Sequence, residues 1–314
     1  MSINVYKQPV FLLSSVRSGS TLLRLMLDSH PNIVNPGECD FLFDKIADNG
    51  TPPEIEDYLE WLKFNRIFLG KKINVDTSMD YENLVDSFVN QMRQPESALV
   101  MNIHRHFYHI PKIFPHAKYI YLIRDGRDVA RSCIGMGWVG NVYYGIDIWC
   151  EAEIAWDRLK ETLHPSQYLE IKYEDLLEDI ESGLGLICHF LGLAYSNSMM
   201  DYASTSTYSL PDKSLCYQWK TKYSRRELSL VERKAGKMLV NRGYELSGVS
   251  ISERSFIEKI QLYFQNKWFR ITYQISAYGF SLFLQYYLAR KLGISTWEKS
   301  LAIRKNAADI KMLK

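Results

Sequence analysis

The chain has little excess charge of either sign. Its 38 Lys and Arg residues stand against 36 Asp and Glu residues, a net charge of +2 over 314 residues. Proteins that bind nucleic acid usually carry a broad basic surface, which this balance does not provide. We therefore expect no nucleic-acid partner. Any anion that the protein binds must be held by a few local arginines and backbone amides.

The sequence also lacks paired cysteines. Its five cysteines are scattered, with no C-x-x-C pair, which is typical of a reducing compartment and argues against a disulfide framework. No His-x-x-x-His motif or paired-Asp cluster is present, so we predict no metal site. The first residues, Met1–Pro9, are polar and lack the apolar stretch and cleavage site of a signal peptide. These features together predict a cytoplasmic location.

Four short apolar runs indicate buried strands, namely Val10–Ser14, Ala98–Met101, Tyr119–Ile123 and Tyr168–Ile171. Each is followed by a polar turn and a stretch with helical periodicity. Strands that alternate with helices predict a three-layer α/β fold with a central parallel sheet. Two surface helices are also expected, in Gly50–Gly70 and Ser78–Arg93. We predict one α/β domain over residues 1–250 and a helical extension over residues 251–314.

The first chemical signal lies between the first predicted strand and a helix that begins near Ser20. The turn between them reads Arg17-Ser-Gly-Ser-Thr21. Free backbone amides at a helix start favour an anion. Gly19 lets the backbone approach a ligand closely, and Arg17 adds a forked cation. The turn therefore predicts a phosphate-binding loop, although ordinary helix capping by its hydroxyl residues would need no ligand.

A nucleotide kinase is an alternative, because kinases share this strand-loop-helix plan. Their G-x-x-x-x-G-K-[ST] motif places a lysine directly before the hydroxyl residue. The loop of this chain has no such lysine, and no glycine opens the motif. The kinase hypothesis is therefore disfavoured.

A second strand-helix junction carries the same type of chemistry. The third predicted strand runs into Arg124, and Arg127 and Ser132 lie in the helical stretch that follows. Arginines and aspartates at a helix start can be no more than solvated ion pairs, which contribute little. Two junctions of this type in one chain, however, are what a ligand with separated phosphate groups requires.

These two junctions resemble those of the sulfotransferases that use 3′-phosphoadenosine-5′-phosphosulfate (PAPS) and release PAP. Arg17–Thr21 is similar to their 5′-phosphosulfate loop, and Arg124 and Ser132 match the pair, eight residues apart, that binds the 3′-phosphate. The tyrosylprotein sulfotransferases and the bacterial proteins built like them are the most similar, as Met26–Pro31 illustrates. The resemblance covers roughly residues 8–247 and implies a P-loop-NTPase-like fold.

The resemblance also implies a set of donor-binding residues: Arg17, Ser18, Gly19, Ser20, Thr21, Leu22, Arg124, Arg127, Ser132, Tyr173 and Lys220. Arg17 would in addition be catalytic, by neutralising the charge that grows on the leaving 5′-phosphate. Lys220 is included because Gln218 stands where the tyrosylprotein enzymes have a lysine for the nucleotide. The long loop Tyr202–Tyr217 is expected to form a lid.

Two residues are candidates for the general base. Glu38 stands where the tyrosylprotein enzymes carry their catalytic Glu, and His104 follows the strand after which the small-molecule enzymes carry a catalytic His. We favour Glu38. Many relatives also have a lysine near Asn102 that contacts the transferring group, but no lysine lies between residues 93 and 111. Asn102 or Arg105 would then have to replace it, or the protein functions without such a residue.

The acceptor is the component of the reaction that the sequence defines least. Large apolar residues after Glu38 and after Ser132, aromatic except for one methionine, suit a small metabolite or a glycan that carries a hydroxyl or amine. They are Phe41, Phe43, Met136, Trp138, Tyr143 and Tyr144. The near-neutral charge gives no support to an acidic peptide, so a protein-tyrosine sulfotransferase is an alternative. A non-catalytic nucleotide-binding protein is another.

The C-terminal part contains an uncharged run, Ile271–Ala289, with basic and aromatic flanks. Its length approaches that of a membrane span, but it contains glutamines and several tyrosines. We expect this run to pack against its own domain or against a second copy in a homodimer. The flanks would also allow contact with a membrane surface through residues 268–291.

Overall fold

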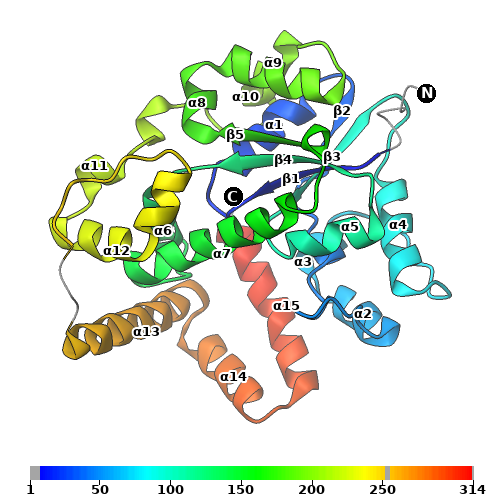
Figure 1. Cartoon of the computed structure of the whole chain (residues 1–314). Coiled ribbons are helices and arrows are strands. Elements are labelled where there is room, and N and C mark those ends of the chain that lie inside the picture. Colours follow the sequence, from blue (N-terminus) through cyan, green and yellow to red (C-terminus); the bar gives the residue numbers. More distant parts are fainter. Residues whose placement is uncertain (1–7, 252–254, 313–314) are drawn as a thin grey trace.

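The computed structural model describes residues 8–251 and 255–312 (Figure 1). Residues 1–7, where the sequence predicts a short polar start, lie outside the described residues. Five parallel strands form one sheet in the order β2-β3-β1-β4-β5. Their bounds are β1 Val10–Ser14, β2 Ile33–Val34, β3 Ala98–Ile103, β4 Lys118–Ile123 and β5 Tyr168–Lys172. The predicted α/β fold with a central parallel sheet is confirmed.

Strand β1 lies at the centre of the sheet. Its Leu12 is opposite Asn102 of β3 on one side and Ile120 of β4 on the other. Successive side chains of a strand point to opposite faces, so Phe11 packs into one hydrophobic layer and Leu12 into the other. Because helices cover both faces, every residue of β1 and β3 is buried.

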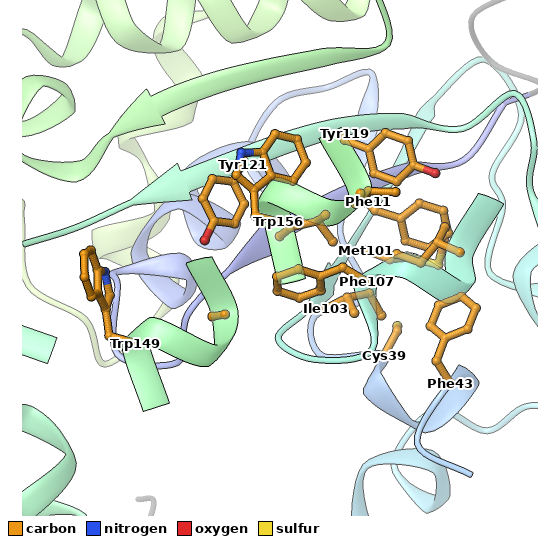
Figure 2. Close-up of a cluster of buried hydrophobic side chains, with 14 of the residues drawn as sticks. Phe11, Cys39, Phe43, Met101, Ile103, Phe107, Tyr119, Tyr121, Trp149 and Trp156 are labelled. Atoms are coloured by element: carbon orange, nitrogen blue, oxygen red, sulfur yellow. The ribbon is translucent and has the colours of Figure 1, made fainter. Parts of the chain in front are cut away.

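The helices form the two outer layers (Figure 1). One layer contains α1 (Ser20–Asp28), α8 (Tyr173–Glu178) and α9 (Ile180–Leu191), and the opposite layer contains α4 (Tyr81–Gln91), α7 (Val142–Lys160) and α12 (Arg225–Asn241). Figure 2 shows the second of these layers, in which Trp156 of α7 stacks on Tyr121 of β4 with ring centroids 4.4 Å apart. Buried aromatic pairs of this kind fix the position of α7 on the sheet.

The remaining helices are shorter or lie outside the two layers: α2 Ile55–Leu62, α3 Arg66–Leu69, α5 Ile110–Ile113, α6 Gly126–Gly135, α10 Tyr202–Thr205, α11 Trp219–Lys222, α13 Phe256–Tyr278, α14 Phe280–Lys291 and α15 Ser295–Met312. The predicted helix in Gly50–Gly70 is thus two helices, α2 and α3, and that in Ser78–Arg93 is α4. The predicted lid contains α10 and a 3₁₀ turn at Lys213–Leu215.

The C-terminal extension is helical, as predicted, in the part that the structure describes. The uncharged run Ile271–Ala289 is divided between α13 and α14, because Gly279 between them has a φ of +80°. No helix among the described residues has both the length and the apolar character needed to cross a membrane. Helix α13 packs on the loop before α7, where Asn266 accepts a hydrogen bond from the backbone N–H of Gly140 at 2.6 Å.

Candidate functional site

All five strands run in the same direction, so their carboxyl ends meet at one edge of the sheet, where α/β proteins bind their ligands. The phosphate-binding loop follows β1 at this edge, and Glu38 follows β2. His104, Arg124 and Tyr173 directly follow β3, β4 and β5. The parallel topology therefore brings together residues that are far apart in the sequence.

Two cavities adjoin at this edge. The first, of about 400 Å³, is lined by Arg17, residues 19–22, Arg124, Tyr173 and residues 208–212 of the lid, and we call it the loop cavity. The second, of about 700 Å³, opens beside it. Val16, Glu38, His104 and Trp138 line both cavities. These four residues therefore form the passage between the two cavities.

The loop after β1 has the backbone of an anion site. Arg17 and Gly19 have φ values of +67° and +95°, and such turns gather backbone N–H groups into a concave surface. Helix α1 begins at Ser20 without any side-chain capping bond, so simple capping does not account for the hydroxyl residues of the loop. The buried Ser18 hydroxyl has no hydrogen-bond partner among the described residues, which is unusual for a buried polar group.

Tyr173 closes one side of this loop. A Cβ atom added at Gly19 would lie 2.3 Å from Cε2 of Tyr173, closer than any side chain tolerates. Glycine at position 19 is therefore required by both its positive φ and the ring that lies against it. The hydroxyls of Ser20 and Thr21 and the side chain of Leu22 come from the first turn of α1, and these three residues line the loop cavity.

Arg124 connects the loop to the lid. Its Nη1 donates to the carbonyl of Arg17 at 3.1 Å, and its Nη2 donates to the carbonyl of Leu215 in the lid at 2.7 Å. The guanidinium lies over the ring of Tyr173, 4.5 Å from the ring centroid. Its Nε is buried and has no partner among the described residues. A partly satisfied cation at the cavity wall is suited to an anionic ligand.

Arg17 and Ser132 bring the two predicted anion sites together. The Nε of Arg17 donates to the Ser132 hydroxyl at 3.0 Å, although the two residues are 115 positions apart in the sequence. The side chain of Arg17 is exposed and lines the loop cavity. Ser132 lines neither cavity, but Arg17 and Arg124, one from each junction, both line the loop cavity, so one ligand can contact both junctions there.

Arg127 lies in a different environment from the one expected. Its guanidinium is buried, forms two hydrogen bonds to Asp125 at 2.9 and 2.8 Å and bonds Glu232 at 2.7 Å. The ring of Trp219 covers it, with 3.5 Å between the guanidinium carbon and a ring centroid. Its placement gives no support to a donor contact. Arg127 instead joins the start of α6 to α12 and to the segment after the lid.

Lys220 also lies away from the cavities. Its Nζ lies over the rings of Tyr217 and Trp219, 4.8 and 5.8 Å from the centroids, and it lines neither cavity. Residues 208–212 and Leu215 of the lid line the loop cavity instead. The segment expected to form a lid therefore lies at the site, and Lys220 does not.

Glu38 and His104 differ in their surroundings. Glu38 is exposed in the passage, where its backbone pairs with that of Asn102. His104 is held from two sides: its Nδ1 lies 3.1 Å from Asp40 Oδ2, and its Nε2 lies 3.1 Å from the Ser20 hydroxyl in the loop. The backbone N–H of His104 also donates to Asp40 Oδ1 at 2.7 Å.

The charges of this pair follow from its geometry. Burial alone would lower the pKa of His104, but the charge and hydrogen bond of Asp40 outweigh burial and raise that pKa above its ordinary value. Burial would likewise raise the pKa of Asp40, and His104 more than reverses that effect. Each side chain therefore favours the charged form of the other. Sequence reasoning missed Asp40, whose only local signal is its place two residues after Glu38.

Neither residue considered as a replacement for the family lysine reaches the loop cavity. The Asn102 side chain is buried and bonds the Asn35 amide at 3.1 Å and the Ser20 carbonyl at 3.4 Å. Arg105 forms a two-point ion pair with Asp44 and lines the second cavity.

Most of the aromatic residues expected around the acceptor lie elsewhere. Phe41 and Phe43 are wholly buried in the core (Figure 2 shows Phe43), and the ring of Tyr143 lies 3.7 Å from the Nζ of Lys234. Trp138 alone among the six lines the second cavity, whose lining also includes Tyr108 and other residues that the sequence did not single out. They are Asp48, Ile67, Ile148, Glu151, Ala152 and Ala155.

The chain was compared with known proteins. Residues 9–197 match the model of the sulfotransferase family. Protein-tyrosine sulfotransferase 1 of Danio rerio is 24% identical over 210 residues, and the match covers 62% of this chain and 55% of that protein. The chain thus spans about half the length of this relative.

Two solved structures are similar. The sulfotransferase domain of the Synechococcus olefin synthase superposes with a TM-score of 0.54 and 23% identity, over 73% of this chain and 96% of that domain. The sulfotransferase domain of the curacin biosynthetic pathway gives a TM-score of 0.51 and 22% identity, over 76% and 98%. At these identities the likeness establishes the fold.

Proposed function

Because the chain belongs to the sulfotransferase family, we propose that it transfers a sulfuryl group from PAPS to an acceptor hydroxyl or amine and releases PAP. One observation carries the proposal. A cavity walled by a phosphate-binding loop and Arg124 opens into a second cavity, and Glu38 and His104 stand in the passage between them. That arrangement suits a donor on one side, an acceptor on the other and transfer between them.

The residues present fit a donor with separated phosphates. Arg17, the backbone amides of residues 18–21 and the hydroxyls of the loop would hold the 5′-phosphosulfate. Arg124 and Ser132 would hold the 3′-phosphate, and the unpartnered Nε of Arg124 and hydroxyl of Ser18 are groups that a ligand would satisfy. When bound, PAPS supplies a sulfuryl group already activated by its link to phosphate. No group of three or more His, Cys, Asp or Glu among the described residues is placed to hold a metal ion.

Glu38 is the better candidate for the base. Asp40 raises the pKa of His104 and so favours its imidazolium form, which cannot accept a proton. The exposed Glu38 carboxylate would take the proton of the acceptor as the new bond to sulfur forms and the bond to the 5′-phosphate oxygen breaks. Arg17 would stabilise the negative charge that develops on that oxygen. The sulfate ester (a sulfamate for an amine), PAP and the proton on Glu38 then account for all atoms of the acceptor and donor.

Because the lysine that many relatives have near position 102 is absent, His104 is the candidate to stabilise the transferring group. Its Nε2 lies 3.1 Å from the Ser20 hydroxyl at the start of α1, and both residues line the loop cavity. A cation fixed there would stabilise negative charge on the transferring group, without the reorganisation that a flexible lysine needs. Asp40 would act as the positioning residue that keeps this imidazole charged and oriented.

A small metabolite or a glycan is the acceptor class that the second cavity favours. Its lining combines the flat face of Trp138 with Tyr108 and with carboxylates, among them Asp48 and Glu151. Carboxylates disfavour the acidic peptides in which tyrosines are sulfated. Protein-tyrosine sulfation is the second candidate, because the Danio rerio relative carries that name.

Calorimetry with PAP tests the donor assignment. We expect PAP to bind without magnesium and more tightly than ATP with Mg²⁺. Tighter binding of ATP with Mg²⁺ would contradict the proposal and favour a kinase. Incubation with radiolabelled PAPS and pools of metabolites, glycans and tyrosine peptides would then identify the acceptor class, whereas PAP binding without label transfer to any pool would favour the non-catalytic alternative.

A further inference from the structure

Helices α13 and α14 expose an unusual number of large apolar side chains. On α13 they are Phe256, Ile257, Ile260, Tyr263, Phe264 and Trp268, and at α14 they are Phe280, Leu284, Tyr287, Leu288 and Leu292. Trp268 is 70% exposed and Phe256 75%. Exposed apolar groups that gather in this way mark an interaction surface.

The spacing of these side chains places them on one face of each helix. On α13, Phe256, Ile260, Phe264 and Trp268 recur every four residues, and on α14 the same spacing links Phe280, Leu284, Leu288 and Leu292. We call these two exposed faces together the apolar arm. Figure 1 shows α13 and α14 on the outside of the α/β domain.

The opposite face of α13 is the one attached to the domain. Leu262 is buried, and its carbonyl accepts a hydrogen bond from the Asn141 side chain at 2.9 Å. The ring of Tyr273 lies directly on Gly137, where an added Cβ would be 2.1 Å from it. The contacts with the domain therefore leave the apolar arm uncovered.

The charges beside the apolar arm are almost all positive. Residues 256–291 contain five basic side chains and a single acidic one, Glu258, although the whole chain is nearly balanced. Glu258 pairs with Arg226 at 3.2 Å, and Arg290 pairs with Glu298 of α15 at 3.6 Å, which leaves Lys259, Lys267, Arg270 and Lys291 beside the apolar arm. Two copies that met through this face by two-fold symmetry would bring like charges together. An anionic surface is complementary to it, and tryptophan, tyrosine and basic residues beside apolar ones are typical of bilayer interfaces.

We propose that α13 and α14 bind to the surface of an anionic lipid bilayer through the apolar arm, lying in the interface without crossing it. Membrane binding would also affect the acceptor cavity, because of where α13 packs on the α/β domain. Gly137 and Gly140, on which α13 packs, flank Trp138, which lines both cavities. Docking of the arm therefore holds the acceptor cavity close to the bilayer, so an acceptor that is itself an amphiphile would be favoured. This last step rests on the proposed function, whereas membrane binding does not.

Flotation of the full chain with vesicles tests the proposal. We expect binding to vesicles of phosphatidylcholine with phosphatidylserine, little binding to phosphatidylcholine alone, and release at high salt. The double variant F264S/W268S should lose binding at least about tenfold, because both side chains are exposed and contribute area only to the membrane. K267Q and R270Q should each weaken binding by about fivefold. L186S, at an exposed apolar site on α9, is the matched control and should bind normally.

Equal binding to neutral and anionic vesicles, or binding that survives F264S/W268S, would overturn the proposal. A dimer in light scattering that dissociates in the same variant, without vesicle binding, would assign the face to a second copy instead. PAP binding, measured by calorimetry on the same samples, shows whether the proposed function fails independently of the arm.

Discussion

The sharpest prediction concerns Asp40→Asn. The substitution keeps the size of the side chain and removes the charge beside Nδ1 of His104. An opposite charge at hydrogen-bond distance raises a histidine pKa by roughly 1 to 3, and a pKa difference of one corresponds to about 1.4 kcal/mol. We therefore expect the pKa of His104, which Asp40 raises against the effect of burial, to fall by about that amount in the variant.

The direction in which kcat changes with pH distinguishes the two possible roles of His104, a cation that stabilises charge or the general base. If His104 acts as a cation, kcat declines as the pH rises through its pKa, and Asp40→Asn moves this decline to lower pH. At a pH above the new pKa, lowering the pKa of His104 by one reduces the protonated fraction by up to about tenfold. If His104 were the base, kcat would instead rise with pH through the same pKa, and the variant would move that rise to lower pH.

The assay is kcat against pH at saturating PAPS, with the imidazole of His104 followed by NMR in the same pH range. Asp48→Asn, in the lining of the second cavity, is the matched control and should leave the His104 titration in place. A kcat that rises through the NMR pKa of His104 would refute the assigned roles. A His104 titration that does not respond to Asp40→Asn would refute the ion pair itself.

Three further predictions follow from the site. Glu38→Gln should lower kcat by about 10²–10⁴-fold while PAP affinity, measured by calorimetry, is retained. Arg124→Ala should weaken PAP far more than 5′-AMP, because Arg124 is assigned to the 3′-phosphate. Arg127→Met should lower the free energy of unfolding by about 3–5 kcal/mol in denaturant titrations, since Asp125 and Glu232 would be left buried without their cation.

Each of these predictions has a control and an opposite outcome. Full turnover in Glu38→Gln would remove it as the base. Arg131→Ala is the control for Arg124→Ala: it changes an exposed arginine on α6 and should leave PAP binding intact. Equal losses of affinity for PAP and 5′-AMP in Arg124→Ala would contradict the assignment of Arg124 to the 3′-phosphate. Arg226→Met breaks the exposed pair with Glu258 and should cost under about 1 kcal/mol, so a similar cost for Arg127→Met would contradict its buried role.

The sequence predicts the features that arise from neighbouring residues. Strand β1 and the loop that follows it consist of consecutive residues, Val10–Thr21. The junction at Arg124 is also local in the sequence. Strand β2, Ile33–Val34, has only two residues and therefore too few to show an alternation. The fold and the phosphate-binding loop could therefore be predicted from the sequence.

Features that depend on distant contacts were not predictable in this way. Arg127 looks like a solvated residue at a helix start, but Glu232 and Trp219, more than 90 positions away, enclose it. The pairing of Asp40 with His104 spans 64 positions. Periodicity and local motifs carry no information about such partners, because burial is decided by how the layers assemble.

Arg124 has a consequence for the timing of the catalytic cycle. Two of the five N–H groups of its guanidinium bond the carbonyls of Arg17 and Leu215, and Asp128 Oδ2 lies 3.9 Å from Nη2, so only part of the donor set remains for a ligand. A bound phosphate would thus add to the bonds that keep the lid in place rather than compete with them. Departure of the spent nucleotide would then wait for the lid to open, a motion of microseconds to milliseconds in other enzymes. Arg124→Lys, which keeps the charge but loses the planar fork, would speed that departure.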